Sequence, residues 1–234
     1  MAFPTVLDAL IQVFTSSNTS HNVAMPATVG ANNALLVLIQ MAGNVTITTP
    51  GGWTSLGQVA DSTPSSRMAA FGKVAVGDED GTTVDFVSAS ACKAASNVYQ
   101  ISSWFQDLAG IAIATGGSNN HDPPSLSPSW GALDTLWIIT ASQDGNIGVN
   151  AGTVPTDYGN RINAHYDEST LESYVDSARR EFNSATDNPV AWGNSAANFA
   201  FTLAIRPSAG GGGGTIKGRR TLHMLGTRMG SRTL

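Results

Sequence analysis

The chain has 234 residues, of which 41% are hydrophobic and only 12% are charged, with a formal net charge of −5 and a single cysteine, Cys92. One cysteine excludes an internal disulfide framework and a thiolate metal cluster within one chain. The longest apolar run, residues 34–39, is too short to cross a bilayer, and residues 1–5 lack the basic region and apolar stretch of a secretory signal. We therefore expect a product made in the cytoplasm, without membrane insertion, whose weakly charged surface suits close-packed assemblies.

Short runs of strand-forming residues follow one another along the chain, separated by turn residues such as Pro50-Gly51-Gly52 and Asp144-Gly145-Asn146. The clearest run is the last, in which aromatic and branched residues alternate with smaller ones until Pro207 ends the pairing. This rhythm is typical of an all-β protein. In chain order, strands are predicted over residues 21–25, 34–41, 45–48, 68–76, 83–87, 98–104, 136–140 and 199–205.

Residues 165–182 are the one candidate for a helix, because they are rich in Glu, Asp, Ser and Arg. Alignment of this stretch with residues 68–76 instead predicts a polar, exposed strand flanked by loop. In that strand Tyr174 and Val175 would lie on opposite faces.

The chain also echoes itself at a spacing of about 100 residues, which divides residues 1–208 into related halves at about 30–105 and 130–207. Each half would supply four or five strands, and neither sheet could bury its apolar face alone. One two-sheet sandwich, or two sandwiches packed together, is therefore predicted. The matched pieces are residues 33–39 with 133–139, Pro50 and Trp53 with Pro155 and Tyr158, Met68, Phe71 and Ala75 with Leu171, Tyr174 and Ala178, and residues 97–99 with 198–200.

A glycine linker, residues 209–214, separates this body from a basic C-terminal tail, residues 215–234. The tail holds five of the 12 Lys and Arg residues and no Asp or Glu, so its formal charge is +5 against −10 for the rest of the chain. A glycine stretch of this kind is a flexible coil with a reach of about 12 Å, so we expect the tail to act as a separate docking peptide.

The order of several motifs resembles β-sandwich proteins of tailed-phage virions: residues 35–39, then Pro50-Gly51-Gly52-Trp53-Thr54, then Phe71-Gly72-Lys73-Val74-Ala75, then the final aromatic strand. The resemblance covers roughly residues 30–206 and implies a jelly-roll-like sandwich. It also implies a structural role as a head decoration, spike, or neck or tail fibre component. Proteins of this kind are usually homotrimers and not enzymes. The linker and the tail lie outside the resemblance.

Three tryptophans, Trp53, Trp104 and Trp130, are candidate platforms on which a sugar could stack. For Trp53 we favour a role in covering the open end of the core, because it follows a Pro-Gly-Gly turn. The acidic turn at residues 78–81, with Asp85 beyond it, offers oxygen ligands for Ca²⁺ but lacks the spacing of a dedicated loop. A solvated hairpin turn is the favoured interpretation there.

The remaining polar residues form no recognisable catalytic motif. The four histidines, at positions 21, 121, 165 and 223, are dispersed, and the sequence has no Gly-x-Ser-x-Gly elbow, phosphate-binding loop or Cys-x-x-Cys. We therefore assign no catalytic, cofactor-binding or metal-binding residue and expect a protein that is not an enzyme. A pair of carboxylates for glycoside hydrolysis is kept as an alternative.

For the tail, docking on another virion protein of the capsid, neck or tail is favoured over disorder, and both over nucleic acid. The expected function is thus that of a virion structural protein, a trimer held to the particle by its tail. The alternatives are a carbohydrate-binding module that recognises a host glycan and, behind it, a glycoside hydrolase. The partner-binding residues of the tail are Lys217, Arg219, Arg220, Leu222, Met224, Leu225, Arg228 and Arg232.

Overall fold

The computed structural model describes residues 1–62, 65–117, 122–143, 152–166, 173–193 and 199–209. Among these residues, no helix has the length and apolar character that a membrane crossing requires. The elements in the described ranges are β1 (Thr5–Ala24), β2 (Ala34–Met41), β3 (Thr54–Ser62), β4 (Ser65–Val74), β5 (Thr83–Ser102), the 3₁₀ turn η1 (Leu108–Gly110), β6 (Ile111–Gly116), β7 (Leu133–Gln143), β8 (Gly159–Tyr166), β9 (Ser173–Ser184) and β10 (Phe199–Ile205).

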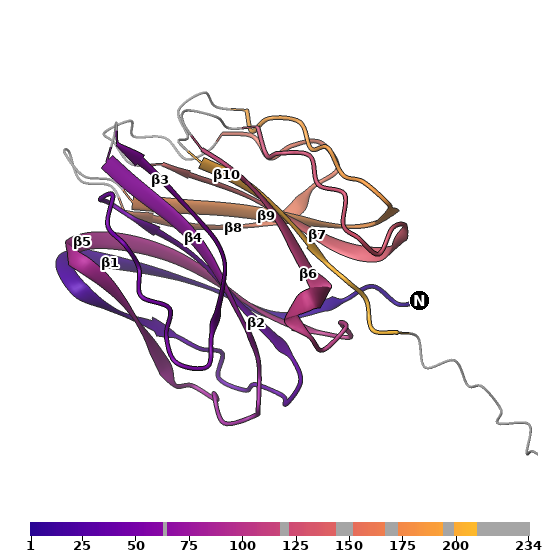
Figure 1. Ribbon diagram of the computed structural model, residues 1–234, viewed down its shortest axis with the longest axis horizontal. Coiled ribbons are helices and arrows are strands. Elements are labelled where there is room, and N and C mark those ends of the chain that lie inside the picture. Colours follow the sequence, from indigo (N-terminus) through magenta and orange to yellow (C-terminus); the bar gives the residue numbers. More distant parts are fainter. Residues whose placement is uncertain (63–64, 118–121, 144–151, 167–172, 194–198, 210–234) are drawn as a thin grey trace, which may run out of the picture.

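The strands form two five-stranded antiparallel sheets that pack face to face (Figure 1). The first sheet has the order β1-β5-β2-β4-β3 and the second the order β6-β10-β7-β9-β8. The prediction of an all-β sandwich is therefore confirmed. Each half of the chain supplies one sheet, and the two orders are the same when each half is counted from its own first strand.

The packing between the sheets follows the same relation. Strand β1 lies over β8, and β3 lies over β6. In the matching of the two halves, β1 corresponds to β6 and β3 corresponds to β8. The β1–β8 contact is therefore equivalent to the β6–β3 contact. The halves are thus arranged about an approximate two-fold axis.

The shared core lies between the sheets and is built from the alternate residues of central strands. Leu36 and Leu38 of β2 face Leu136 and Ile138 of β7 and the aromatic residues of β10, all in one buried cluster. Strands β2 and β10 are buried along their whole lengths, as expected for strands with neighbours on both sides and a covered outer face. Burial of apolar surface at about 25 cal/mol per Å² is the main force that holds the two sheets together.

Loops cover the outer faces of both sheets. Over the first sheet, the distal halves of β1 and β5 and the loop that contains Met25 and Val29 enclose a second cluster around Phe71 and Phe86. Over the second sheet, Val154, Tyr158 and Trp192 pack on Tyr174 and Ala178.

Two strand predictions match the structure closely and others differ from it. Residues 34–41 and 199–205 are strands over the predicted bounds. Residues 45–48 do not form a strand, because Ile47 makes only an isolated bridge to Ser88. The predicted strands at 21–25 and 83–87 are the distal ends of the long strands β1 and β5.

The stretch 165–182 is strand from residue 173 onward, and residues 167–172 lie outside the described part. Tyr174 and Val175 do face opposite sides. The expectation of an exposed strand is wrong, because residues 173–178 are all buried between the shared core and the loops of the second sheet.

The turn before β3 is repeated before β8. The N–H of Trp53 donates to the carbonyl of Pro50, and the N–H of Tyr158 donates to that of Pro155, both at 3.1 Å. The residues that precede these aromatics, Gly52 and Asp157, have positive φ angles of 78° and 70°. The alignment of the halves fails at another point, because Val98 packs in the outer cluster and its matched residue Phe199 packs in the shared core.

Candidate functional site

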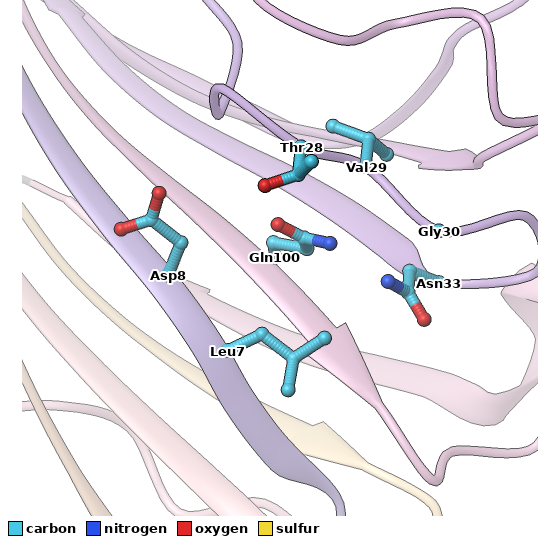
Figure 2. A pocket seen from close by; sticks show the side chains of 7 residues that line it. All are labelled: Leu7, Asp8, Thr28, Val29, Gly30, Asn33 and Gln100. Atoms are coloured by element: carbon cyan, nitrogen blue, oxygen red, sulfur yellow. The ribbon is translucent and has the colours of Figure 1, made fainter.

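A pocket of about 470 Å³ opens on the outer face of the first sheet, where β1 and β5 meet the loop that leads into β2 (Figure 2). This volume is within the range of roughly 300–1,000 Å³ that small-molecule sites occupy. Figure 2 shows the amide of Gln100 at the centre of the pocket, between side chains from the strands and side chains from the loop. The lining residues are Leu7, Asp8, Thr28, Val29, Gly30, Asn33 and Gln100.

A bulge in β1 creates one side of the pocket. Val6 pairs with Ile101 and Asp8 pairs with Gln100, so Leu7 is the extra residue on β1. A bulge changes the direction in which the neighbouring side chains point. Here it places Asp8 beside Gln100 on the outer face and leaves Leu7 projecting at the rim with 55% of its surface exposed.

The acidic turn at residues 78–81 holds the opposite wall in place. The Asp80 carboxylate accepts a hydrogen bond from the N–H of Val29, and the N–H of Gly81 donates to the carbonyl of Pro26 at 2.8 Å. Val29 is itself buried in the outer cluster. The loop that carries Thr28, Val29 and Gly30 is therefore fixed by backbone bonds and by packing.

Glu79 of the same turn is buried, which corrects the expectation of a fully solvated turn. It forms an ion pair with Lys73 at 2.8 Å and accepts hydrogen bonds from the N–H groups of Val76 and Gly77 at 3.0 Å. Burial alone would raise the pKa of Glu79, but the hydrogen bonds from Lys73 and the two backbone groups lower it to about 2. The carboxylates of this turn thus act as anchors for backbone.

The pocket contains polar groups that the fold does not use. Gln100 is 3% exposed, and the described residues provide no hydrogen bond to its side-chain amide. Asp8 also lines the pocket, and one of its carboxylate oxygens accepts a hydrogen bond from the N–H of Ala9 at 2.8 Å. Within the described part of the chain no basic side chain lines the pocket. Sequence reasoning missed this site, because Asp8, Thr28, Asn33 and Gln100 are brought together by strand pairing between distant segments.

The tryptophans considered as sugar platforms are mostly in the core. Trp104 is fully buried and its indole N–H donates to the carbonyl of Asn32 at 2.7 Å. Trp53 is 7% exposed and stands edge-on to Phe86, at 5.7 Å between ring centroids. Neither ring has a free face for a sugar. Trp130 keeps partial exposure, and its N–H donates to the Thr135 hydroxyl at 3.2 Å.

His21, Ser88 and Cys92 form a buried polar cluster that the sequence did not reveal. The His21 Nε2 lies 3.2 Å from the Ser88 hydroxyl and 3.7 Å from the Cys92 sulfur. Burial lowers the pKa of His21, and the negative charge of Asp85 offsets only part of this effect. Burial raises the pKa of the Cys92 thiol. A neutral imidazole beside a protonated thiol is a packed structural contact and not an activated nucleophile.

Of the other histidines, only His165 lies among the described residues, and it joins no metal site there. His165 stands edge-on to Tyr174 at 6.0 Å between ring centroids, and His121 and His223 lie outside the described residues. Across the described ranges, no group of three His, Cys, Asp or Glu side chains is placed to hold a metal ion.

Two buried carboxylates on the outer face of the second sheet are both paired with arginines. Asp176 binds Arg161 through both oxygens, with the Nε bond at 2.6 Å. Asp187 binds Arg180 and accepts a hydrogen bond from the Tyr158 hydroxyl. Arg161 also donates to the carbonyl of Gly152 at 2.8 Å, so these two arginines attach the loops at Gly152 and Asp187 to the sheet. A second depression nearby, of about 420 Å³, is lined by residues of the same network, including Asp157 and Arg180.

The tail and its linker from Gly210 lie outside the described residues, and so do the partner-binding residues assigned to the tail. The last described connection of the body is the hydrogen bond from the N–H of Ser208 to the carbonyl of Ser103, at 2.9 Å. Next to it, Pro207 bridges to Trp104 at the end of the sandwich.

Comparison of the chain with protein-family models, with curated proteins and with solved structures gave no match. The assignment of a function therefore depends on the chain's own residues and geometry.

Proposed function

We propose that the protein is a structural component of a tailed-phage virion, a head decoration, spike, or neck or tail fibre subunit. In this proposal the sandwich is the displayed body, and residues 215–234 are the segment that attaches it to a neighbouring virion protein. The observation that carries the proposal is the separation of charge along the chain. The basic tail, +5, follows five glycines after a body of −10.

The completeness of the body supports this division. Strand β10 lies inside the second sheet between β6 and β7 and ends at Ile205. The three buried clusters are built from residues up to Ile205. Among the described residues, both sheets and all three clusters are formed without the tail, and in this proposal the tail is used to bind another chain.

The composition of the tail favours a protein partner. Leu222, Met224 and Leu225 interrupt the basic residues, a mixture suited to apolar pockets surrounded by acidic groups. A homotrimer would carry three such tails, so that a weak contact for each tail becomes durable attachment through effective concentration.

Deletion of residues 210–234 tests the proposal. The truncated chain should fold with an unchanged melting temperature, because both sheets are complete, and should be missing from purified particles. A full-length variant with Lys217, Arg219, Arg220, Arg228 and Arg232 all changed to Gln separates charge from apolar contact. This variant should be present on particles at lower occupancy than the parent chain, and the difference between the two should become smaller at high salt.

Two results would contradict the proposal. One is truncated protein present in particles at full occupancy. The other is the absence of the intact chain from particles made in cells that express it.

A further inference from the structure

We propose that the pocket around Gln100 is a binding site for a neutral sugar unit, held by hydrogen bonds to neighbouring hydroxyl groups. This inference goes beyond the proposed virion role. It concerns residues of the body alone and does not depend on how the tail is attached.

Gln100 is the residue that indicates a ligand. The residue as a whole is 3% exposed, and its amide points into the pocket, where the described residues give it no hydrogen bond (Figure 2). The amide therefore faces the open space of the pocket with donors and an acceptor that the fold does not use. A ligand that both donates and accepts would satisfy the NH₂ and the carbonyl of this side chain together.

The other polar groups define the class of that ligand. The Asp8 carboxylate accepts hydrogen bonds, the Asn33 amide and the Thr28 hydroxyl both donate and accept, and neither of the latter two side chains has a described hydrogen bond that competes. Adjacent hydroxyl groups match such a mixture of donors and acceptors. An anionic ligand does not match, since the pocket contains a carboxylate and, in the described part of the chain, no basic side chain.

Apolar surface flanks the polar groups on two sides. Leu7 is exposed at the rim and Val29 forms the loop wall (Figure 2). Small-molecule sites combine such apolar walls with a few placed polar groups, and the C–H face of a sugar ring suits these walls.

The site is formed before any ligand arrives. The bulge at Leu7 orients Asp8, and the hydrogen bonds of Asp80 and Gly81 hold the loop with Thr28 and Val29. Asn33 is fixed at the start of β2, where its carbonyl accepts from the N–H of Ala75 at 2.8 Å. A preformed site loses little entropy on binding, so even a single sugar unit should be detectable.

The experiment is a titration of the full chain, labelled with ¹⁵N, with separate neutral monosaccharides: glucose, galactose, mannose, rhamnose and N-acetylglucosamine. At least one sugar should shift the side-chain NH₂ signals of Gln100 and the backbone signals of Thr28, Gly30 and Asn33 in a saturable manner. Millimolar affinity is expected for a single unit at an open site.

Variants separate binding from structure. Gln100→Met keeps the length of the side chain and removes the amide, so binding should weaken by about tenfold or more. Its melting temperature should stay the same or rise, because the amide has no partner to lose. Asp8→Asn should weaken binding several-fold and provides the test if Gln100→Met is poorly folded. Gln106→Met, at an exposed position away from the pocket, should bind as the parent chain does.

Methylammonium chloride is titrated in parallel to distinguish a sugar from a cationic ligand, which the Asp8 carboxylate could also attract. Saturable shifts at Gln100 with methylammonium and none with any sugar would overturn the proposal. Shifts that map outside the pocket, absence of saturation with all five sugars, or equal affinity for Gln100→Met would also overturn it.

Discussion

Glu79 shows how a residue that looks functional in the sequence serves the architecture in the fold. In the sequence it belongs to an acidic turn with a candidate cation site. In the structure its carboxylate binds Lys73 and the N–H groups of Val76 and Gly77, and it is 4% exposed. The turn that it organises supports the loop wall of the pocket.

Acid should therefore destabilise the body through Glu79. Its pKa of about 2 in the folded chain is below the ordinary value of 4.5, so its stabilising contribution is complete above pH 4.5 and is lost as the pH falls towards 2. By the rule of 1.36 kcal/mol for each pKa unit, this contribution is up to about 3 kcal/mol. Chemical denaturation at several pH values would measure it.

Glu79→Gln is the matched variant for this measurement. It should be less stable than the parent chain at neutral pH, and the difference should shrink on acidification. A difference that stays constant from neutral pH to pH 2 would show that the carboxylate charge contributes nothing.

The sequence did not predict the polar residues of the pocket or the buried histidine cluster. Gln100, Asp8 and Asn33 carry no motif, and they meet because β5 pairs with both β1 and β2. His21 and Cys92 meet across 71 residues for the same reason. The core role favoured for Trp53 could be predicted, because its turn and its aromatic ring are local features.

At the scale of elements, the position of a strand in its sheet decides how well the sequence predicts it. Strands β2 and β10 are central and apolar, and their bounds were predicted. The strands β3, β6 and β8, and the first part of β1, were not predicted. All four strands lie at sheet edges. An edge strand is covered less fully, so its residues need not follow a strict alternation of apolar and polar side chains.

The repeated turn before β3 and β8 allows a clean test of backbone conformation. Gly52 has φ of 78°, and a Cβ atom added there would meet only the end of Lys73, at 4.0 Å. Gly52→Ala should therefore destabilise the fold by about 1 kcal/mol through the left-handed backbone and not through a steric clash.

The neighbouring glycine is the control. Gly51 has no positive φ and no atom within 4 Å of an added Cβ, so Gly51→Ala should leave stability unchanged or raise it slightly. Thermal unfolding of the two variants gives the comparison. Equal melting temperatures would mean that the turn tolerates a side chain at both positions and that its geometry is not the constraint.

At the scale of the whole molecule, a pattern repeated along the sequence becomes two sheets with one strand order. The repeat along the sequence predicted two related halves, because each half carries a similar series of strands and the same Pro-x-x-aromatic turn, but it left open one sandwich or two packed sandwiches. It did not predict the register. Val98 and Phe199 were matched but face different clusters, because a shift of one residue exchanges the two faces of a strand.

Buried polar contacts help to define how the sheets meet. The Asn97 amide donates to the Val175 carbonyl at 3.1 Å, and the hydroxyl groups of Tyr99 and Ser177 lie 2.7 Å apart.

We propose that the sandwich is displayed and that the basic tail attaches it to a virion. The most direct measurement transfers the tail to an unrelated protein. Residues 209–234 are fused to a monomeric fluorescent protein, the fusion is expressed in cells that produce the particles, and fluorescence is measured for each purified particle.

The fusion should appear on particles, and an excess of the full-length chain should displace it. A fusion with the five basic residues changed to Gln should give less fluorescence for each particle. A fusion that stays entirely off the particles, while the chain without residues 210–234 remains on them, would contradict attachment by the tail.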